Sequence, residues 1–156
     1  MKRAFTLIEL IVVLGMLATL MSVSFINLLK TQQSANLSST SSQFITDLKS
    51  QQIRSMTGDT ENSGLISSYG IYIQSSSYTI FRGTDYLPQD ASNFVINLPT
   101  SISLSTNMVD SQIVFLPGSG NISNYDSNLD HITITDTSSG ESIAYHFNQY
   151  GVIVSP

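Results

Sequence analysis

Near its N-terminus the chain reads Arg3-Ala4-Phe5-Thr6-Leu7-Ile8-Glu9-Leu10-Ile11-Val12-Val13-Leu14, an apolar run that one acid interrupts. The run continues over residues 10–29 without a charged side chain. At the rise of an α-helix these residues extend about 30 Å, which is the thickness of the hydrocarbon core of a bilayer. We therefore expect residues 5–29 to form a transmembrane helix.

Positive charge is concentrated before this segment. Lys2, Arg3 and the amine of the chain precede it, whereas only Lys30 follows it closely. Cytoplasmic flanks of membrane helices are enriched in Lys and Arg. The predicted orientation has the N-terminus in the cytoplasm and the bulk of the chain outside.

Glu9 distinguishes three kinds of N-terminal segment: a cleaved secretory signal peptide, an unprocessed signal anchor and a pilin-type signal. A carboxylate at the middle of a bilayer costs on the order of 2.5–3.5 kcal/mol, and somewhat less near an end. A signal peptide has an uninterrupted apolar core, and a simple anchor gains nothing from an acid. Glu9 therefore indicates a functional group that needs a partner of opposite charge.

Residues 3–14 resemble the N-terminal signal of type IV pilins and type II secretion pseudopilins. In that family a prepilin peptidase cuts just before the Phe and methylates the new amine. The resemblance implies a leader of residues 1–4, cleavage between Ala4 and Phe5, and methylation of Phe5. The fifth mature residue of the family is a glutamate, which here is Glu9. Ala4 departs from the family, because glycine is usual at that position.

The same resemblance implies that Glu9 acts in assembly. A methylated amine stays cationic, so an ion pair between Glu9 and the Phe5 amine of a neighbouring subunit removes two uncompensated charges from lipid. Breaking one partner of such a buried pair costs about 3–5 kcal/mol. The expected partners are other pilin or pseudopilin subunits, the prepilin peptidase and the inner-membrane assembly platform. The expected location is the inner membrane, as a single-pass protein, and then the filament.

Residues 30–57 are expected to extend the helix in amphipathic form, with Gly58 as its C-terminal cap. Residues 38–42 are all Ser or Thr, which are poor helix formers, so a break near them stays open. The predicted apolar stripe consists of Leu37, Phe44, Ile45, Leu48, Ile53 and Met56.

Residues 58–156 are expected to form an extracytoplasmic, β-rich domain without a helix, because apolar residues alternate there in short runs between turn residues. The fold class is therefore α+β, a long helix on antiparallel sheet. This order is similar to the minor GspH/FimT-like pseudopilins, in which a strand like Ile113-Val114-Phe115-Leu116-Pro117-Gly118 precedes a hairpin and a final strand containing glycine. The predicted strands cover residues 68–74, 78–82, 94–98, 102–105, 112–116, 131–135, 142–147 and 151–154.

Composition excludes several functions. The chain has no cysteine, so it has neither a disulfide nor a thiolate metal site. Residues 31–156 hold three basic and ten acidic residues, a net charge of −7. Because such a domain repels phosphate, we expect no nucleic-acid partner. We also expect no enzymatic activity, because no catalytic constellation is evident.

Two groups of residues carry atoms that can ligate a metal ion. His131 and His146 could meet across paired strands, but two imidazoles are too few ligands for a metal site. Asn121, Asn124, Asp126, Asn128 and Asp130 form an oxygen-rich loop, whose spacing is not that of an EF-hand, and Asx residues are common in turns. Gly118-Ser119-Gly120 lacks the pattern of a nucleophilic serine, and we expect a turn. The sequence therefore predicts no metal site and no cofactor, with a calcium loop left as an alternative.

The leading hypothesis is a minor pseudopilin of a type II secretion pseudopilus. A minor type IV pilin or a competence pilin is the nearest alternative. An unprocessed, membrane-anchored binding domain is an alternative from a different class.

Overall fold

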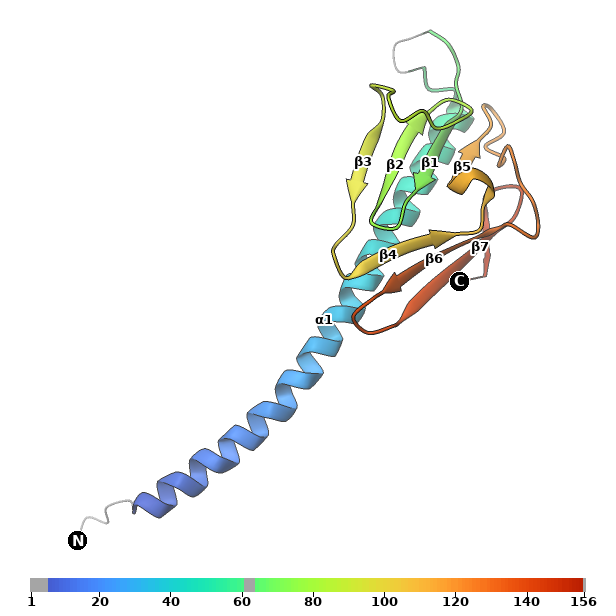
Figure 1. Ribbon diagram of the computed structural model, residues 1–156. Coiled ribbons are helices and arrows are strands. Elements are labelled where there is room, and N and C mark those ends of the chain that lie inside the picture. The colour runs from blue at the N-terminus through green and yellow to red at the C-terminus, as the bar shows by residue number, and fades with distance from the viewer. Residues whose placement is uncertain (1–5, 61–63, 156) are drawn as a thin grey trace.

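One long helix is followed by eight strands in the part of the chain that the structure describes (Figure 1). This structure is a computed structural model that describes residues 6–60 and 64–155, with the side chains of residues 23–31, 33 and 155 left undescribed. Helix α1 spans Leu7–Thr57. The strands are β1 (Tyr69–Ile73), β2 (Ser77–Arg82), β3 (Phe94–Asn97), β4 (Ile102–Thr106), β5 (Gln112–Phe115), β6 (His131–Asp136), β7 (Ser142–Phe147) and β8 (Ile153–Ser155).

Helix α1 ends at Gly58, as the sequence predicts. Gly58 takes the left-handed conformation, with φ of 67°. Its N–H donates to the Ser55 carbonyl, and the N–H of Asp59 donates to the Arg54 carbonyl. These two bonds satisfy carbonyls that have no partner within the helix, which is the arrangement of a Schellman motif.

The helix runs through the Ser- and Thr-rich residues 38–42 without a break. Ser41 is buried there, and its hydroxyl is hydrogen-bonded to that of Tyr145 on β7. Tertiary contacts of this kind override weak helix propensity. The break that the sequence left open is therefore absent.

The buried face of α1 differs in part from the predicted stripe. Leu37, Phe44 and Leu48 are buried as expected. Ile53 and Met56 are 58% and 49% exposed, so the prediction that they belong to the packed stripe was wrong. The buried face instead continues along one helical stripe at intervals of three and four residues, through polar positions. Its members are Leu37, Ser41, Phe44, Leu48, Gln51 and Ser55.

The strands form two antiparallel sheets. One has the order β3-β2-β1-β5 and the other β4-β6-β7-β8. The hairpin of β1 and β2 pairs Ile71 with Ile80, and the hairpin of β6 and β7 pairs Ile134 with Ile143. The α+β class and the antiparallel pairing are confirmed, and the strands lie within a few residues of their predicted positions.

Both sheets contribute to one core against the C-terminal half of α1 (Figure 1). Phe44 and Leu48 of the helix are fully buried. The ring of Phe44 packs edge-on against that of Tyr78 on β2, with centroids 5.1 Å apart. The other buried members of the core are Leu37, Ile71, Ile73, Ile102, Leu104, Met108, Ile113, Phe115, Ile122, Ile132, Ile134 and Phe147.

A short 3-10 turn, η1 (Val109–Ser111), joins β4 to β5. The sequence predicted no helix beyond Gly58. That prediction was wrong for these three residues. Asp110 has a positive φ of 55° and interrupts the turn, so η1 stays at three residues.

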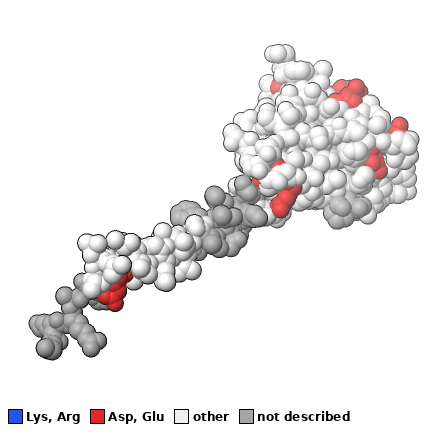
Figure 2. All heavy atoms as spheres, turned by 60° about the horizontal axis from the view of Figure 1, so that its bottom comes forward, with Lys and Arg blue, Asp and Glu red and all other residues white. Residues whose placement is uncertain are grey.

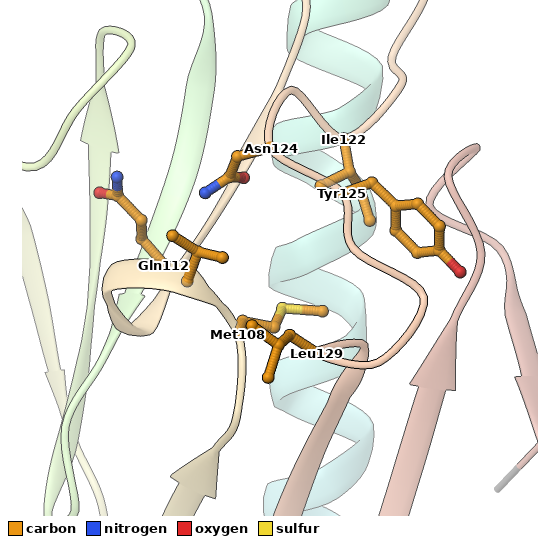
Figure 3. Close-up of a pocket in the computed structure, with 7 residues that line it drawn as sticks. Met108, Gln112, Ile122, Asn124, Tyr125 and Leu129 are labelled. Carbon is orange, nitrogen blue, oxygen red and sulfur yellow. The ribbon is translucent and has the colours of Figure 1, made fainter.

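A narrow recess lies between η1 and the loop before β6 (Figure 3). The space inside it is about that of one water molecule. The recess is therefore too small for a substrate. Its lining consists of Met108, Val109, Gln112, Ile122, Asn124, Tyr125 and Leu129.

Candidate functional site: the exposed first turns of the long helix

The first turns of α1 project from the β domain and expose their apolar side chains (Figure 1). Every Leu, Ile, Val and Met side chain from Leu7 to Met21 is between 47% and 77% exposed. Soluble monomeric proteins rarely expose a large, continuous apolar surface. Such a surface marks a site of contact with lipid or with another protein. This surface is the candidate functional site.

Apolar side chains surround the helix here instead of forming a stripe. Leu10, Ile11, Val12, Val13 and Leu14 are consecutive and all exposed. A helix that is apolar on every side is suited to a surrounding that is apolar on every side, such as lipid or a bundle of similar helices.

No helix in the described part of the chain has the length and mean hydropathy of a membrane span. The span expected from the sequence covers residues 5–29. Of these, Phe5 and the side chains of residues 23–29 lie outside the described ones.

Glu9 lies in the first turn of α1 and takes part in the N-terminal cap. Thr6 is the capping residue, and its hydroxyl accepts a hydrogen bond from the Glu9 N–H at 3.3 Å. In return, the Glu9 carboxylate accepts from the Thr6 N–H and hydroxyl, each at 3.4 Å. This reciprocal pair is a capping box, and a negative charge at a helix N-terminus is favoured by the helix dipole.

The capping box gives Glu9 a role within its own chain that the sequence reasoning missed. Thr6 followed three residues later by Glu9 is the pattern that signals it. The carboxylate nevertheless stays exposed and has capacity for a further donor. Acidic atoms stand among uncharged ones on the coloured part of the projecting helix nearest its N-terminus (Figure 2), and Glu9 is the one charged residue in residues 6–29.

The predicted cleavage and methylation site cannot be placed beside Glu9. Ala4 and Phe5 lie outside the described residues, together with the rest of the leader. Their predicted roles stay predictions. Thr6 is the N-cap, so a chain cut before Phe5 would keep the complete capping box.

The residues that the sequence weighed for a metal lie at one end of the second sheet. His131 and His146 are opposed across β6 and β7, as the sequence allowed. Asp130 lies beside both histidines. The sequence placed Asp130 in the preceding oxygen-rich loop, so it was not predicted to be their partner. Asp126 accepts instead from the backbone and side-chain amides of Asn128, as in an ordinary Asx turn.

The sequence Gly118-Ser119-Gly120 forms a turn, as expected. The Gly120 N–H donates to the Leu116 carbonyl at 2.9 Å. The Ser119 hydroxyl accepts from the N–H of Asn121 at 3.2 Å. Ser119 therefore serves the local backbone.

Comparison of the chain with protein-family models, with curated proteins and with solved structures found no significant match. A functional assignment therefore depends on the chemistry of the chain's own residues.

Proposed function

We propose that the chain is a minor pseudopilin, a non-enzymatic structural subunit of a type II secretion pseudopilus. The observation that carries the proposal is the exposed apolar surface of α1 from Leu7 to Met21, with Glu9 in the first turn, on a sequence that resembles the pilin signal. The β domain is held outside the membrane, and subunits assemble through their N-terminal helices.

The proposed mechanism begins with insertion of residues 5–29 into the inner membrane. Lys2 and Arg3 hold the N-terminus on the cytoplasmic side. Prepilin peptidase then cuts between Ala4 and Phe5 and methylates the Phe5 amine. Glu9 of an incoming subunit pairs with this amine on its neighbour, which neutralises both charges in lipid and sets the register of the helices.

Mass spectrometry of the full chain tests the processing step. The chain would be extracted from membranes of cells that produce an active prepilin peptidase, and cells with an inactive peptidase would provide the control. We expect a mature chain that begins at methylated Phe5 only where the peptidase is active. An intact Met1 in both strains, or a cut after the apolar run, would support the anchored binding domain or a secreted protein instead.

Substitution of Glu9 tests the assembly step. Glu9→Gln removes the charge but keeps an oxygen that accepts from Thr6, so it separates ion pairing from capping. We expect Glu9→Gln and Glu9→Ala to insert normally and to reduce incorporation into filaments at least tenfold, because loss of one partner of a buried pair costs about 3–5 kcal/mol. The measurement is the amount of each variant in sheared filaments relative to membranes.

Two further variants serve as controls for this measurement. Thr6→Ala removes the side-chain cap but leaves the Glu9 carboxylate, and it should assemble nearly as well as the unaltered chain. Asp85→Ala removes an exposed acid on the β domain and should have no effect. Normal assembly of Glu9→Gln together with failure of Thr6→Ala would assign Glu9 to capping alone and refute the pairing.

A further inference from the structure

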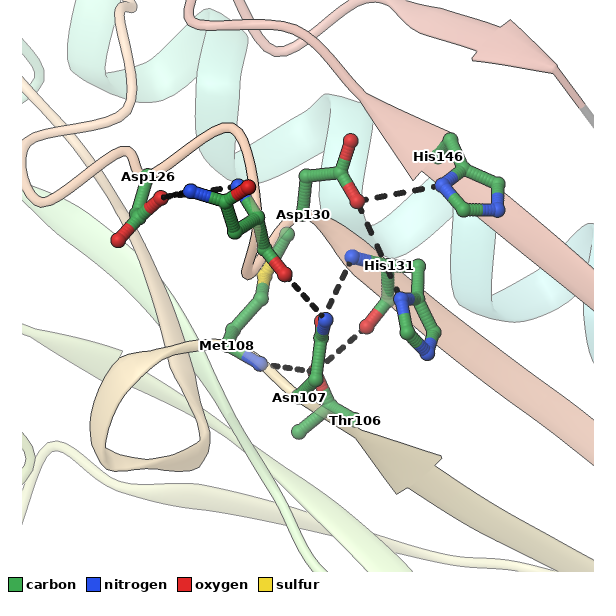
Figure 4. A network of polar contacts seen from close by, with 8 residues as sticks. Thr106, Asn107, Met108, Asp126, Asp130, His131 and His146 are labelled. Carbon is green, nitrogen blue, oxygen red and sulfur yellow. Dashed lines mark hydrogen bonds and ion pairs between the residues drawn. The ribbon is translucent and has the colours of Figure 1, made fainter.

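Three side chains with metal-binding atoms meet where β6 and β7 pair (Figure 4). His131 opens β6, and His146 is opposite it on β7. The Phe147 N–H donates to the Asp130 carbonyl at 2.9 Å. In an antiparallel ladder, hydrogen-bonded and non-hydrogen-bonded residue pairs alternate. The next pair, His131 and His146, is therefore one that exchanges no backbone hydrogen bonds. Side chains lie closest together at such pairs, so the sheet register brings the two imidazoles together.

The distances among the three side chains suit a small divalent ion. The Asp130 Oδ1 atom lies 3.2 Å from Nδ1 of His146 and 3.9 Å from Nδ1 of His131. All three ligand atoms lie within 4.8 Å of one another. Tetrahedral zinc, with bonds of about 2.0–2.2 Å, holds its ligand atoms about 3.3 Å apart. Ligand atoms that lie up to 4.8 Å apart would have to move closer together to hold one ion.

The backbone of His131 is held in place from a neighbouring strand. Its N–H donates to Oδ1 of Asn107 at 2.9 Å, and its carbonyl accepts from the Thr106 hydroxyl at 2.9 Å. The other end of the Asn107 amide donates to the Asn128 carbonyl at 3.0 Å. These bonds fix the start of β6, and ligands on rigid elements form more precise sites than ligands on loops.

The group is open to solvent, and its ligand atoms favour Zn²⁺ over Ca²⁺. The side chains of His131 and His146 are 37% and 41% exposed, and that of Asp130 is 20% exposed. An ion can therefore enter, and a water molecule can complete its coordination. Two imidazoles and one carboxylate suit Zn²⁺, whereas Ca²⁺ requires six to eight oxygen ligands.

We propose that Asp130, His131 and His146 bind one Zn²⁺ ion, with water as the fourth ligand. The site would link the start of β6 to β7 at one end of the second sheet. It differs from the calcium loop considered from the sequence, because it takes only the last residue of that loop. The proposal is independent of the pilin assignment.

Isothermal titration calorimetry of the full chain with ZnCl₂ tests the proposal. The chain would be purified in detergent without a polyhistidine tag. It contains two histidines and no cysteine, so the proposed site holds every imidazole and competes with no thiolate. We expect one ion per chain and at least tenfold weaker binding in Asp130→Asn and in His146→Gln, because each lacks one of three ligands.

Asp126→Asn is the matched control for Asp130→Asn. It removes a carboxylate from the same loop but leaves the three proposed ligands, so its zinc affinity should equal that of the unaltered chain. As a second readout, Zn²⁺ should shift the side-chain nitrogen resonances of both histidines, which can be assigned because they are the only two. CaCl₂ at the same concentration should leave them unchanged.

Several results would overturn the proposal. One is equal zinc affinity in the unaltered chain and in Asp130→Asn. Another is an ion shared by two chains, which would give half an ion per chain. A response to Ca²⁺ that Asp126→Asn abolishes would assign the metal to the loop instead.

Discussion

Tyr78 joins the helix to the first sheet through both its ring and its hydroxyl. The hydroxyl donates to Oδ2 of Asp47 on α1 at 2.5 Å, and the residue is almost fully buried. Burial, followed by the hydrogen bond to Asp47 and its negative charge, raises the pKa of Tyr78. The folded protein therefore keeps this proton at a pH where the unfolded chain loses it.

Tyr78→Phe should lower the free energy of unfolding by about 1.5–3 kcal/mol at neutral pH, because it removes a hydrogen bond to a charged group. The stabilisation by Tyr78 is complete below its unfolded pKa of about 10 and is lost as pH rises above that value. The difference between the two proteins should therefore shrink between pH 9 and 11. Urea unfolding at several pH values measures it.

Tyr150→Phe is the control, because Tyr150 is 56% exposed. This variant should match the unaltered chain in stability across the same pH range. A difference between Tyr78→Phe and the unaltered chain that stays constant to pH 11 would show that Tyr78 does not stabilise the fold through its proton.

At the scale of elements, α1 is attached to the β domain by close contacts with loop backbone. The Gln52 amide donates to the Gly120 carbonyl at 3.0 Å and to the Tyr150 carbonyl at 2.7 Å. Lys49 donates to the Gly151 carbonyl at 2.9 Å. Gly151 allows this approach because it takes a positive φ of 68° and has no Cβ.

Gly151→Ala should loosen this attachment. An added Cβ would lie 2.6 Å from the Gln52 amide nitrogen and 2.8 Å from the ring of Phe115, in addition to the strain of a positive φ. We expect a loss of about 2–4 kcal/mol in the free energy of unfolding. Gly140→Ala has a similar φ but no neighbour within 4 Å, so it should cost only about 1–2 kcal/mol. Equal losses in urea unfolding would argue against close packing at Gly151.

At the scale of the whole molecule, the packed core and the exposed apolar turns of α1 are different parts of the chain. The hydrophobic core begins at Leu37 and takes in both sheets. Ser34 also contacts the β domain, since its hydroxyl donates to Glu141 at 3.0 Å. The exposed apolar turns from Leu7 to Met21 do not belong to this core.

A chain without residues 1–30 should therefore fold and stay in solution without detergent. It keeps every member of the core, so its β domain should melt cooperatively at the same temperature as in the full chain. Circular dichroism and size-exclusion chromatography check this. Broad melting, or aggregation at low concentration, would mean that residues 1–30 contribute to the stability of the β domain.

Much of this fold was predictable because the deciding patterns are local. Alternation of apolar residues places the strands, and Gly58 ends the helix, since both effects depend on a few consecutive residues. The apolar run and Glu9 are equally visible in the sequence, and they carry the proposed function. Local patterns do not reveal which strands share a sheet, so the division into two sheets was not predicted.

Contacts between distant segments explain the rest. Ser41 is buried because Tyr145, 104 residues later, supplies its hydrogen-bond partner, and no helix propensity reports that. Asp130 belongs to a polar loop in the sequence, and it becomes a neighbour of His131 and His146 only because β6 and β7 pair in one register. Composition and periodicity describe each segment alone, whereas a binding group made by several segments exists only after they pack.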